Sequence, residues 1–495
     1  MTTRSRGVNP STRSERANGG DLVRRAAVIV VLTGSSLLVP MTSSAAVGRP
    51  DVVVVMTDDQ RQPSLDKMPK LQRVLVERGA SLSGFFVENA LCCPSRSTFL
   101  TGRHSNATGV WTNNAPDGGW TAFEPHESET LAVALKSAGY RTGYIGKYLN
   151  EYDRAGLHVP RGWDRWWAFS EENGAYFNYD AVTRVVGQRL PRLTTYGASA
   201  ADYSTDVIAR TASGFIRSAP TDQSIFTVVM PYAPHGPATP APRDVDQFRT
   251  EPVPLNPAML ETDLTDKPAY IRTHNDVTQA MIQSAERKQW TALQAVDDLV
   301  AKIVTALSNS GRLSHTLIVF TSDNGEAYGE HNWRYKLAPY EQSIQVPFVA
   351  RYEGVVPASS SSDRLASNVD LAATIADYTG VAFPTDGVSL RPLLEGGASV
   401  RGSILLEHLD YPAEQSIKVP TYCGVRTVRH KFVRYVDGFE ELYDLAADPW
   451  ELENLAGKPG VKDVQTNLRA TARSLCPGPP GYDWSSARNS SKARE

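Results

Sequence analysis

The sequence predicts an α/β protein built on a large, mostly parallel sheet with helices on both faces. Apolar runs rich in β-branched residues alternate along the chain with segments whose apolar residues repeat at helical spacing. Polar residues directly follow four of these apolar runs. Because ligands of such sheets bind beyond the carboxyl ends of the strands, the same pattern predicts where a functional site lies.

Four segments are predicted to be strands of the main sheet. The first, "DVVVVMTDDQ", is a continuous β-branched run, which is typical of a strand buried on both faces. The other three are shorter apolar runs that also end in polar groups. The four strands are 51–60, ending in Asp58 and Asp59; 141–148, ending at Lys147; 224–236, ending near His235; and 315–326, ending in Asp323 and Asn324.

Helical patterns lie between these strands. Several of them stop at a glycine, which commonly ends a helix. Pro94 suits the first turn of a helix, so a helix is predicted directly after the cysteine pair Cys92–Cys93. The predicted helices are 67–78, 94–101, 128–138 and 286–309. A smaller C-terminal unit is expected from residue 381, with the strand-like segment 422–436.

Composition and charge exclude some classes of protein. The chain has 495 residues, enough to bury a large core, and 41% hydrophobic and 21% charged residues are ordinary for a soluble globular protein. It carries 51 basic and 54 acidic residues, a formal net charge of −3, so a nucleic-acid partner has no electrostatic support.

The N-terminus resembles a targeting segment. Arg24 and Arg25 precede the apolar run 26–39, and small residues near Ala45 offer a cleavage site. We therefore predict a signal peptide over residues 1–46 and a secreted mature protein. Arg24 and Arg25 also fit a twin-arginine export signal, which is the alternative type of signal peptide. The run is short for a membrane span, so no stable span is predicted; a retained anchor is the alternative.

The acidic residues at the strand ends predict a metal site. Asp58, Asp59, Asp323 and Asn324 offer the hard oxygen ligands that calcium and magnesium prefer, and zinc would favour histidine or thiolate. A single Asp-Asp pair is also common as a helix N-cap. The matching Asp-Asn pair at the end of another strand favours a divalent cation.

Basic residues at the same edge predict an anion site. Lys147 follows an apolar strand and a glycine, and Arg96 and Lys336 would add positive charge. The N-terminus of the helix at 94–101 would direct free amides and the positive end of its dipole at residue 92. A cation, a helix N-terminus and basic side chains suit a tetrahedral oxyanion, and sulfate and phosphate both fit.

The four cysteines divide into two pairs. In an exported protein Cys423 and Cys476 are candidates for a disulfide. Cys92 and Cys93 are adjacent, which makes a mutual bond awkward. Two buried thiols packed as small hydrophobic groups are one interpretation of that pair.

The segment "CCPSRSTFLTGR" (92–103) resembles the signature of the sulfatase family, C-x-P-S-R followed by L-T-G. The resemblance extends over about 49–476. Within the family, the chain is similar to the N-acetylglucosamine-6-sulfatase and extracellular heparan glucosamine-6-sulfatase group, in the segments "GYRTGYIGKYLNEY", "APHGP", "AVDDLV" and "TSDNG". It implies an alkaline-phosphatase-like fold with a catalytic domain over 47–380, a C-terminal subdomain over 381–480 containing a short antiparallel sheet, and a disordered tail over 481–495.

The resemblance also implies the chemistry. Cys92 would be converted by a formylglycine-generating enzyme to formylglycine (3-oxoalanine), whose hydrate attacks sulfur with one hydroxyl; the second hydroxyl then collapses to the aldehyde and expels sulfate. Cys93 would be a bystander. By position, one calcium ion would be held by Asp58, Asp59, Cys92, Asp323 and Asn324.

Roles for the bases follow by position in the same way. Arg96 would hold the hydrate, and Lys147 and Lys336 would neutralise sulfate oxygens. His235 would protonate the leaving alcohol. Many arylsulfatases have a histidine two residues after the strand-end lysine, whereas this chain has Leu149. Asn150, His331 or His104 would take its place, and Asn150 and His331 are therefore also expected to contact substrate.

The expected substrate is a small sulfate ester, most specifically the 6-O-sulfate of N-acetylglucosamine or a related sugar. A near-neutral chain gives no sign of the basic groove that a long polyanion needs. Aromatic residues in 161–180 either stack on a sugar or pack a loop onto the sheet. The alternatives are an arylsulfatase of broad specificity and a phosphonate or phosphate ester hydrolase of the same superfold.

Overall fold

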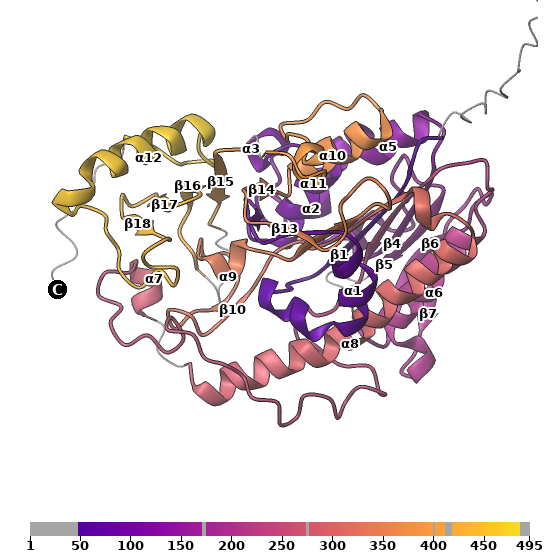
Figure 1. Cartoon of the computed structure of the whole chain (residues 1–495), viewed down its shortest axis with the longest axis horizontal. Helices are drawn as coiled ribbons and strands as arrows, with labels where there is room; N and C mark the ends of the chain where they lie inside the picture. The colour runs from indigo at the N-terminus through magenta and orange to yellow at the C-terminus, as the bar shows by residue number, and fades with distance from the viewer. Residues whose placement is uncertain (1–47, 171–174, 274–276, 399–400, 411–417, 486–495) are drawn as a thin grey trace, which may run out of the picture. The chain divides into compact units, whose positions relative to one another are not determined.

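A ten-stranded sheet forms the centre of the protein in the computed structural model (Figure 1). Its five central strands run parallel, and antiparallel strands flank them on both sides. The order across the sheet is β13 (Ser360–Ser362), β2 (Ala80–Leu82), β12 (Phe348–Arg351), β9 (Thr316–Ser322), β1 (Asp51–Thr57), β8 (Ile225–Met230), β4 (Arg141–Gly146), β5 (Arg165–Phe169), β6 (Tyr179–Arg184) and β7 (Arg192–Tyr196).

The register of the parallel strands brings the four predicted polar ends to one edge. Thr57, the last residue of β1, pairs with Ser322, the last residue of β9. On the other side Gly146, which ends β4, pairs with Met230, which ends β8. The residues that follow these strands therefore emerge side by side, as the sequence predicts.

Strand β1 connects two hydrophobic layers. Val52, Val54 and Met56 point into one layer, and Val53 and Val55 point into the other, because successive side chains of a strand face opposite sides. Helices α2 (Cys92–Thr101), α5 (Leu131–Ser137) and α10 (Asp370–Thr379) cover the first face, and α1 (Pro69–Val74), α6 (Ser204–Arg217) and α8 (Gln279–Asn309) cover the second (Figure 1).

Several element boundaries differ from the sequence prediction. Helix α8 begins at Gln279 rather than 286, because the Thr278 side chain accepts a hydrogen bond from the Met281 N–H and caps it there. Helix α2 begins at Cys92 rather than 94, which places Cys92 inside the first turn. The segment 67–78 is helical only over Pro69–Val74 and is followed by a 3-10 turn, Val76–Arg78.

The aromatic stretch 161–180 packs onto the sheet in its described parts, 161–170 and 175–180. It contains β5 and the start of β6, and Trp163, Trp166 and Trp167 are all buried. Of the two interpretations of this stretch, the structure supports packing rather than a sugar platform for the three tryptophans. Residues 355–363, predicted as a loop, contain the edge strand β13.

The C-terminal region forms a separate antiparallel sheet. Its strands are β15 (Ser403–His408), β16 (Tyr422–Thr427), β17 (His430–Tyr435) and β18 (Glu440–Asp444), with α12 (Lys462–Leu475) packed against it through Leu468 and Ala472. A disulfide joins Cys423 in β16 to Cys476 after α12, which confirms the predicted pairing. Cys92 and Cys93 are free and buried.

The structure describes residues 48–170, 175–273, 277–398, 401–410 and 418–485, and these described residues belong to one compact unit. The predicted signal segment 1–46 and residues 486–495 of the predicted tail lie outside the described residues. Among the described residues, 48–485 with the gaps given above, no helix has the length and apolar character needed to cross a membrane. The short elements are β3 (Phe85–Phe86), α3 (Ser105–Thr108), α4 (Gly119–Phe123), α7 (Ala269–Arg272), β10 (Ala327–Tyr328), β11 (Arg334–Tyr335), α9 (Glu341–Ile344), β14 (Ala366–Ser367) and α11 (Arg391–Leu394).

Candidate active site

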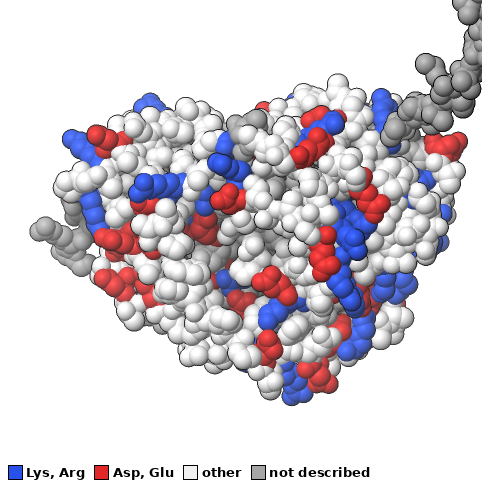
Figure 2. Space-filling view, viewed as in Figure 1, with Lys and Arg blue, Asp and Glu red and all other residues white. Residues whose placement is uncertain are grey.

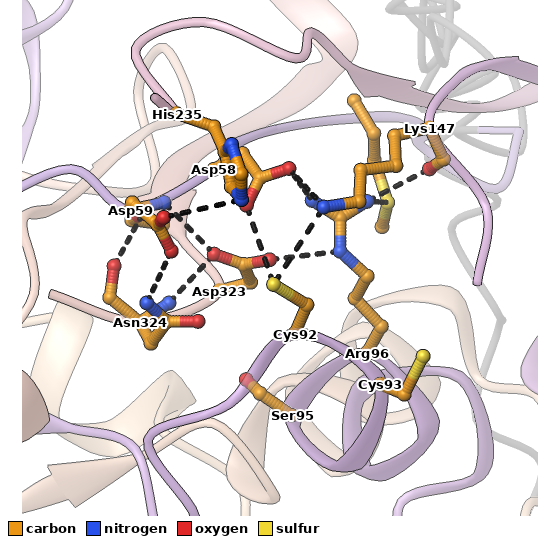
Figure 3. A network of polar contacts seen from close by, with 12 residues as sticks. Asp58, Asp59, Cys92, Cys93, Ser95, Arg96, Lys147, His235, Asp323 and Asn324 are labelled. Atoms are coloured by element: carbon orange, nitrogen blue, oxygen red, sulfur yellow. Dashed lines mark hydrogen bonds and ion pairs between the residues drawn. The ribbon is translucent and has the colours of Figure 1, made fainter. Parts of the chain in front are cut away.

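Cys92 lies at the centre of the polar cluster beyond the strand ends (Figure 3). Its side chain is fully buried at the start of α2. The Sγ lies 3.5 Å from Asp58 Oδ1, 3.6 Å from Lys147 Nζ and 3.0 Å from Lys336 Nζ. Burial and then the Asp58 charge raise the pKa of the thiol, against the opposing effect of the two lysines. The unmodified thiol is therefore protonated in this setting.

The two acids that follow β1 each pair with one lysine. Lys147 Nζ lies 2.6 Å from Asp58 Oδ2, and Lys336 Nζ lies 2.7 Å from Asp59 Oδ1. Burial favours the neutral acid, but Lys147 and the other nearby bases hold the pKa of Asp58 well below its usual range. Asp59 has a φ of 64°, a conformation that aspartate tolerates better than most residues. This turn lets two consecutive carboxylates serve one site.

Gly146 explains how Lys147 reaches the cluster. Its φ is 134°, and a Cβ at this position would lie 1.9 Å from the Met230 carbonyl oxygen of the neighbouring strand. Only glycine allows this close approach. The Lys147 side chain is 2% exposed, and the nearby Asp58 charge raises its pKa despite the opposing effect of burial. Lys147 is therefore a buried, charged ammonium beside Cys92.

Arg96 lies one turn along α2 from Cys92 and is fully buried. Its Nε donates to Asp323 Oδ2 at 2.8 Å, and Nη1 donates to the Lys147 carbonyl oxygen at 2.8 Å. Its Nη2 lies 3.4 Å from Asp58 Oδ2. The guanidinium thus connects α2 to the ends of three strands, and its direct contacts are with these acids rather than with the Cys92 sulfur.

Asp323 and Asn324 complete the oxygen donors. Asp323 Oδ1 accepts hydrogen bonds from the Asp59 and Asn324 backbone N–H groups, and the Asn324 Nδ2 donates to Asp59 Oδ1 at 2.6 Å. Burial, followed by the charges of Asp58 and Asp59, raises the pKa of Asp323 to about 6. The three carboxylates are crowded enough to repel one another.

This donor set fits a hard divalent cation. Asn324 Oδ1 is buried and makes no hydrogen bond to the described residues, so an amide oxygen remains for a ligand. Single ligand atoms of Asp58, Asp59, Cys92 and His235 lie within 4.8 Å of one another. Three carboxylates and one amide oxygen match the preference of calcium for oxygen ligands.

His235 approaches the cluster from the segment after β8. Its Nε2 lies 3.5 Å from Asp59 Oδ2, and its Nδ1 lies 2.8 Å from the Gly236 carbonyl oxygen. Nδ1 must carry a proton to make that second bond, which orients the ring with Nε2 toward the acids. The side chain is 24% exposed, so this edge of the cluster remains accessible.

The three candidates for the histidine missing at Leu149 lie in different surroundings. The Asn150 N–H donates to the Cys93 Sγ at 3.0 Å, so Asn150 contacts the neighbour of the central cysteine. The His331 ring hydrogen-bonds Glu261 Oε2 at 2.6 Å and packs on Tyr340. His104 pairs with Glu88 at 2.6 Å. Of the three candidates, Asn150 contacts Cys93, the residue next to Cys92. The two histidines instead pair with glutamates, His331 with Glu261 and His104 with Glu88.

Two residues of this region escaped the sequence analysis. Asn113 Oδ1 accepts a hydrogen bond from the Cys93 N–H at 2.9 Å and so holds the first turn of α2. Glu326 lies near enough to Asp59 and Lys336 for their charges to act on it. Its position directly after "SDNG" is the signal that predicts such proximity, whereas nothing in the sequence around Asn113 marks it.

Comparisons with known proteins agree with this geometry. The model of the Sulfatase family matches residues 50–381, more than half of the chain, and the model described as N-sulphoglucosamine sulphohydrolase, C-terminal, matches residues 329–476. The chain belongs to the sulfatase family. It is a sulfuric ester hydrolase, and its alkaline-phosphatase-like sulfatase fold and small C-terminal antiparallel sheet confirm the predicted fold class.

Individual relatives narrow the resemblance within the sulfatases. The N-acetylglucosamine-6-sulfatase of Capra hircus is 32% identical over 501 residues, covering 89% of this chain and 88% of the relative. The extracellular sulfatase SULF-1 homolog of Drosophila melanogaster is 35% identical over 373 residues, covering 71% of this chain and 32% of the relative. A protein solved in complex with its substrate D-glucosamine-2-N,6-O-disulfate has a TM-score of 0.71 at 24% identity, covering 86% of this chain and 97% of that one, and so shares the fold.

Proposed function

We propose that this sulfatase hydrolyses the 6-O-sulfate of N-acetylglucosamine or a related sugar, using a formylglycine made from Cys92 and one calcium ion. One observation carries the proposal: the Cys92 Sγ is buried within 3.6 Å of both Lys147 Nζ and Lys336 Nζ and beside the Asp58 carboxylate. The thiol sulfur stands in for the oxygens of the formylglycine hydrate at this position. A nucleophile here would meet an oxyanion between two fixed cations.

The basic side chains of the cluster would have three different roles in the reaction. Lys147 and Lys336 face residue 92 from two sides and would bind the sulfate oxygens as charge develops on them. Arg96, fixed by Asp323 and by the Lys147 carbonyl oxygen, holds α2 and the strand ends in register. His235 Nε2 faces the same cluster and would carry a proton to the departing sugar oxygen.

Asp58, Asp59, Asp323 and Asn324 would hold the calcium ion, with residue 92 as a further ligand. When bound, the ion would neutralise the crowded carboxylates and polarise sulfate oxygens. The buried Asn324 Oδ1 without a hydrogen-bond partner among the described residues supports this assignment. So does the raised pKa of Asp323, which burial causes first and the charges of Asp58 and Asp59 increase; a cation would relieve the repulsion from these two charges.

A small sugar substrate suits the surface charge. On the face in Figure 2, Lys and Arg residues are interspersed with Asp and Glu rather than gathered into one broad basic band. A long polyanion would gain most from a contiguous basic groove. The length over which the N-acetylglucosamine-6-sulfatase of Capra hircus matches this chain supports a glucosamine 6-sulfate.

Export is part of the proposal. The predicted signal peptide and the disulfide between Cys423 and Cys476 both suit an oxidising compartment. A relative whose name calls it extracellular supports the same location. A formylglycine-generating enzyme would then act on Cys92 during maturation, before the fully buried side chain becomes inaccessible.

The test is release of inorganic sulfate from N-acetylglucosamine 6-sulfate, with an aryl sulfate and an aryl phosphonate monoester as comparison substrates. The Cys92→Ala variant measures background. The proposal expects the highest kcat/KM on the sugar sulfate, with no turnover by the variant. A higher kcat/KM on the phosphonate monoester than on either sulfate would contradict it.

A further inference from the structure

A pocket of about 460 Å³ adjoins the active site, within the size range of small-molecule sites. One wall is the segment around His235, including Pro234 and Gly236. A second wall, including Glu326 and Ala327, continues the chain beyond Asp323 and Asn324. Both walls are direct extensions of active-site segments, and the charges of Asp59 and Lys336 act on Glu326. The pocket therefore offers space beside the active site for the part of a substrate that lies beyond its sulfate.

The other walls supply apolar surface and positive charge. Helix α8 contributes Met281 and Ala285 together with Lys288, and β11 contributes Arg334 and Tyr335. The Tyr335 side chain is 41% exposed, although large apolar groups are usually covered, and its φ of 103° is rare for a residue other than glycine. Backbone strain of this kind is found at ligand sites.

Lys288 and Arg334 are the basic residues that line this pocket. Among the described residues neither of them forms an ion pair, and the Arg334 guanidinium contacts the Tyr335 ring at 5.8 Å. Further along α8, Lys302 pairs with Asp206 at 3.1 Å. The pocket therefore presents two positive charges that form no ion pair with an acidic residue in the described part of the chain.

Another wall of the pocket supplies a polar acceptor. Glu326 lies there, hydrogen-bonded by the Tyr328 side chain, whose hydroxyl in turn accepts a hydrogen bond from Gln289 Nε2 at 2.7 Å. This chain of contacts fixes an oxygen acceptor suited to sugar hydroxyls. An anionic group of a bound sugar is favoured near Lys288 and Arg334.

We propose that Lys288 and Arg334 bind a second anionic group of the substrate, so that the enzyme prefers a glucosamine 6-sulfate that carries a further sulfate or an adjacent carboxylate. The proposal rests on the proposed function, because it places the scissile sulfate at Cys92. The second anion has two possible sources with the same chemistry: an N-sulfate on the same ring, or the carboxylate of a neighbouring uronate. Lys288 and Arg334 are thus specificity-determining residues.

The experiment compares three substrates with the calcium-loaded, formylglycine-containing enzyme: N-acetylglucosamine 6-sulfate, glucosamine 2-N,6-O-disulfate, and a disaccharide that joins a uronate to glucosamine 6-sulfate. The variants are Lys288→Gln, Arg334→Gln and the double variant. Arg217→Gln is the matched control, because Arg217 is exposed on α6 and does not line the pocket.

We expect the wild type to prefer one of the doubly charged substrates, and that substrate identifies the source of the second anion. Each single substitution should lower kcat/KM on it by roughly 10-fold, as expected for a charge-assisted hydrogen bond. Turnover of N-acetylglucosamine 6-sulfate should change little, and Arg217→Gln should change neither. Equal wild-type rates on all three substrates, or equal losses on all three in the double variant, would overturn the proposal.

A binding measurement separates this proposal from the proposed function. Calorimetry on the Cys92→Ala variant, which cannot turn over, compares the affinities for the same three sugars with and without the Lys288→Gln and Arg334→Gln substitutions. Tighter binding of a doubly charged sugar that the substitutions abolish supports the role of these residues even if no sugar sulfate is hydrolysed. Equal affinity for the singly and doubly charged sugars would contradict the proposed role of Lys288 and Arg334, whatever activity is measured.

Discussion

Lys336 Nζ lies 3.0 Å from Cys92 Sγ, although the two residues are 244 positions apart in the chain. The same ammonium lies 2.7 Å from Asp59 Oδ1, so the lysine links the start of α2 to the end of β1. The segment that delivers Lys336 contains Tyr335 and Leu337 with φ values of 103° and 76°. Strained backbone on both sides of one lysine indicates that its position is specified closely.

Replacing Lys336 with alanine should therefore impair catalysis far more than folding. Its ammonium faces the position where negative charge develops, and the loss of one such group typically costs roughly 10²–10³-fold in kcat. We expect that loss on both a sugar sulfate and an aryl sulfate, with a melting temperature close to that of the wild type. A Lys336→Ala variant with full turnover would remove this residue from the mechanism.

Calcium should stabilise the protein through Asp323 and Asn324. A ligand that binds only the folded state adds about 2.7 kcal/mol at a concentration of 100 Kd. Chelation should lower the wild-type melting temperature and abolish activity, and added calcium should restore both. In Asn324→Ala the calcium-dependent rise should shrink, because this variant loses the buried amide oxygen that makes no hydrogen bond to any described residue. An identical calcium response in wild type and variant would refute the ligand set.

His235 should matter most for substrates with a poor leaving group. A nitrophenolate departs without a proton, whereas a sugar alkoxide needs one, and general acid catalysis contributes roughly 10²–10⁴-fold. His235→Ala should therefore reduce kcat/KM on the sugar sulfate much more than on the activated aryl sulfate. Equal reductions on both substrates, with calcium binding intact, would assign the histidine to the scaffold.

The sequence allowed these site residues to be predicted because each follows a strand directly. Asp58, Lys147 and Asp323 emerge from neighbouring parallel strands, and the rule that parallel strands present their carboxyl ends together places them. The role of Arg96 was predicted from its position in the C-P-S-R segment that resembles the sulfatase signature. The position of a residue directly after a strand depends only on where that strand ends, and the hydrophobic pattern of the sequence predicts that end.

The pocket residues were not predictable in the same way. Lys288 lies in the third turn of α8, a helix whose predicted start was seven residues late. Arg334 lies in a two-residue strand with no hydrophobic pattern. His331 was expected near the nucleophile, but its ring hydrogen-bonds Glu261 instead. The partners of such residues depend on how loops fold back over the sheet, which periodicity does not encode.

A buried ion pair away from the site predicts how stability depends on pH. Burial opposes charging of His104, but the adjacent Glu88 carboxylate dominates and raises the histidine pKa to about 9, from an ordinary value near 6.5. The folded state therefore binds this proton more tightly than the unfolded state. The resulting stabilisation is complete below about pH 6.5 and is lost as the pH rises toward 9.

The free energy of unfolding of the wild type should accordingly fall over this range by more than that of His104→Gln, with a difference on the order of 2 kcal/mol. Denaturant titrations at pH 6, 7.5 and 9 measure it, and the comparison with the variant cancels the contributions of other titrating groups. Parallel pH profiles for the two proteins would show that the pair does not act in this way.

The adjacent cysteines provide the most direct test of the mechanism. Cys92 Sγ faces the lysines, whereas Cys93 Sγ accepts a hydrogen bond from the Asn150 N–H at 3.0 Å and its pKa is raised by burial to about 12. Cys93→Ala should therefore retain substantial activity, and Cys92→Ala should have none. Peptide mass spectrometry of active wild-type enzyme should find an aldehyde at residue 92, in proportion to specific activity. Full sulfate release by protein whose Cys92 is an unmodified thiol would contradict the account.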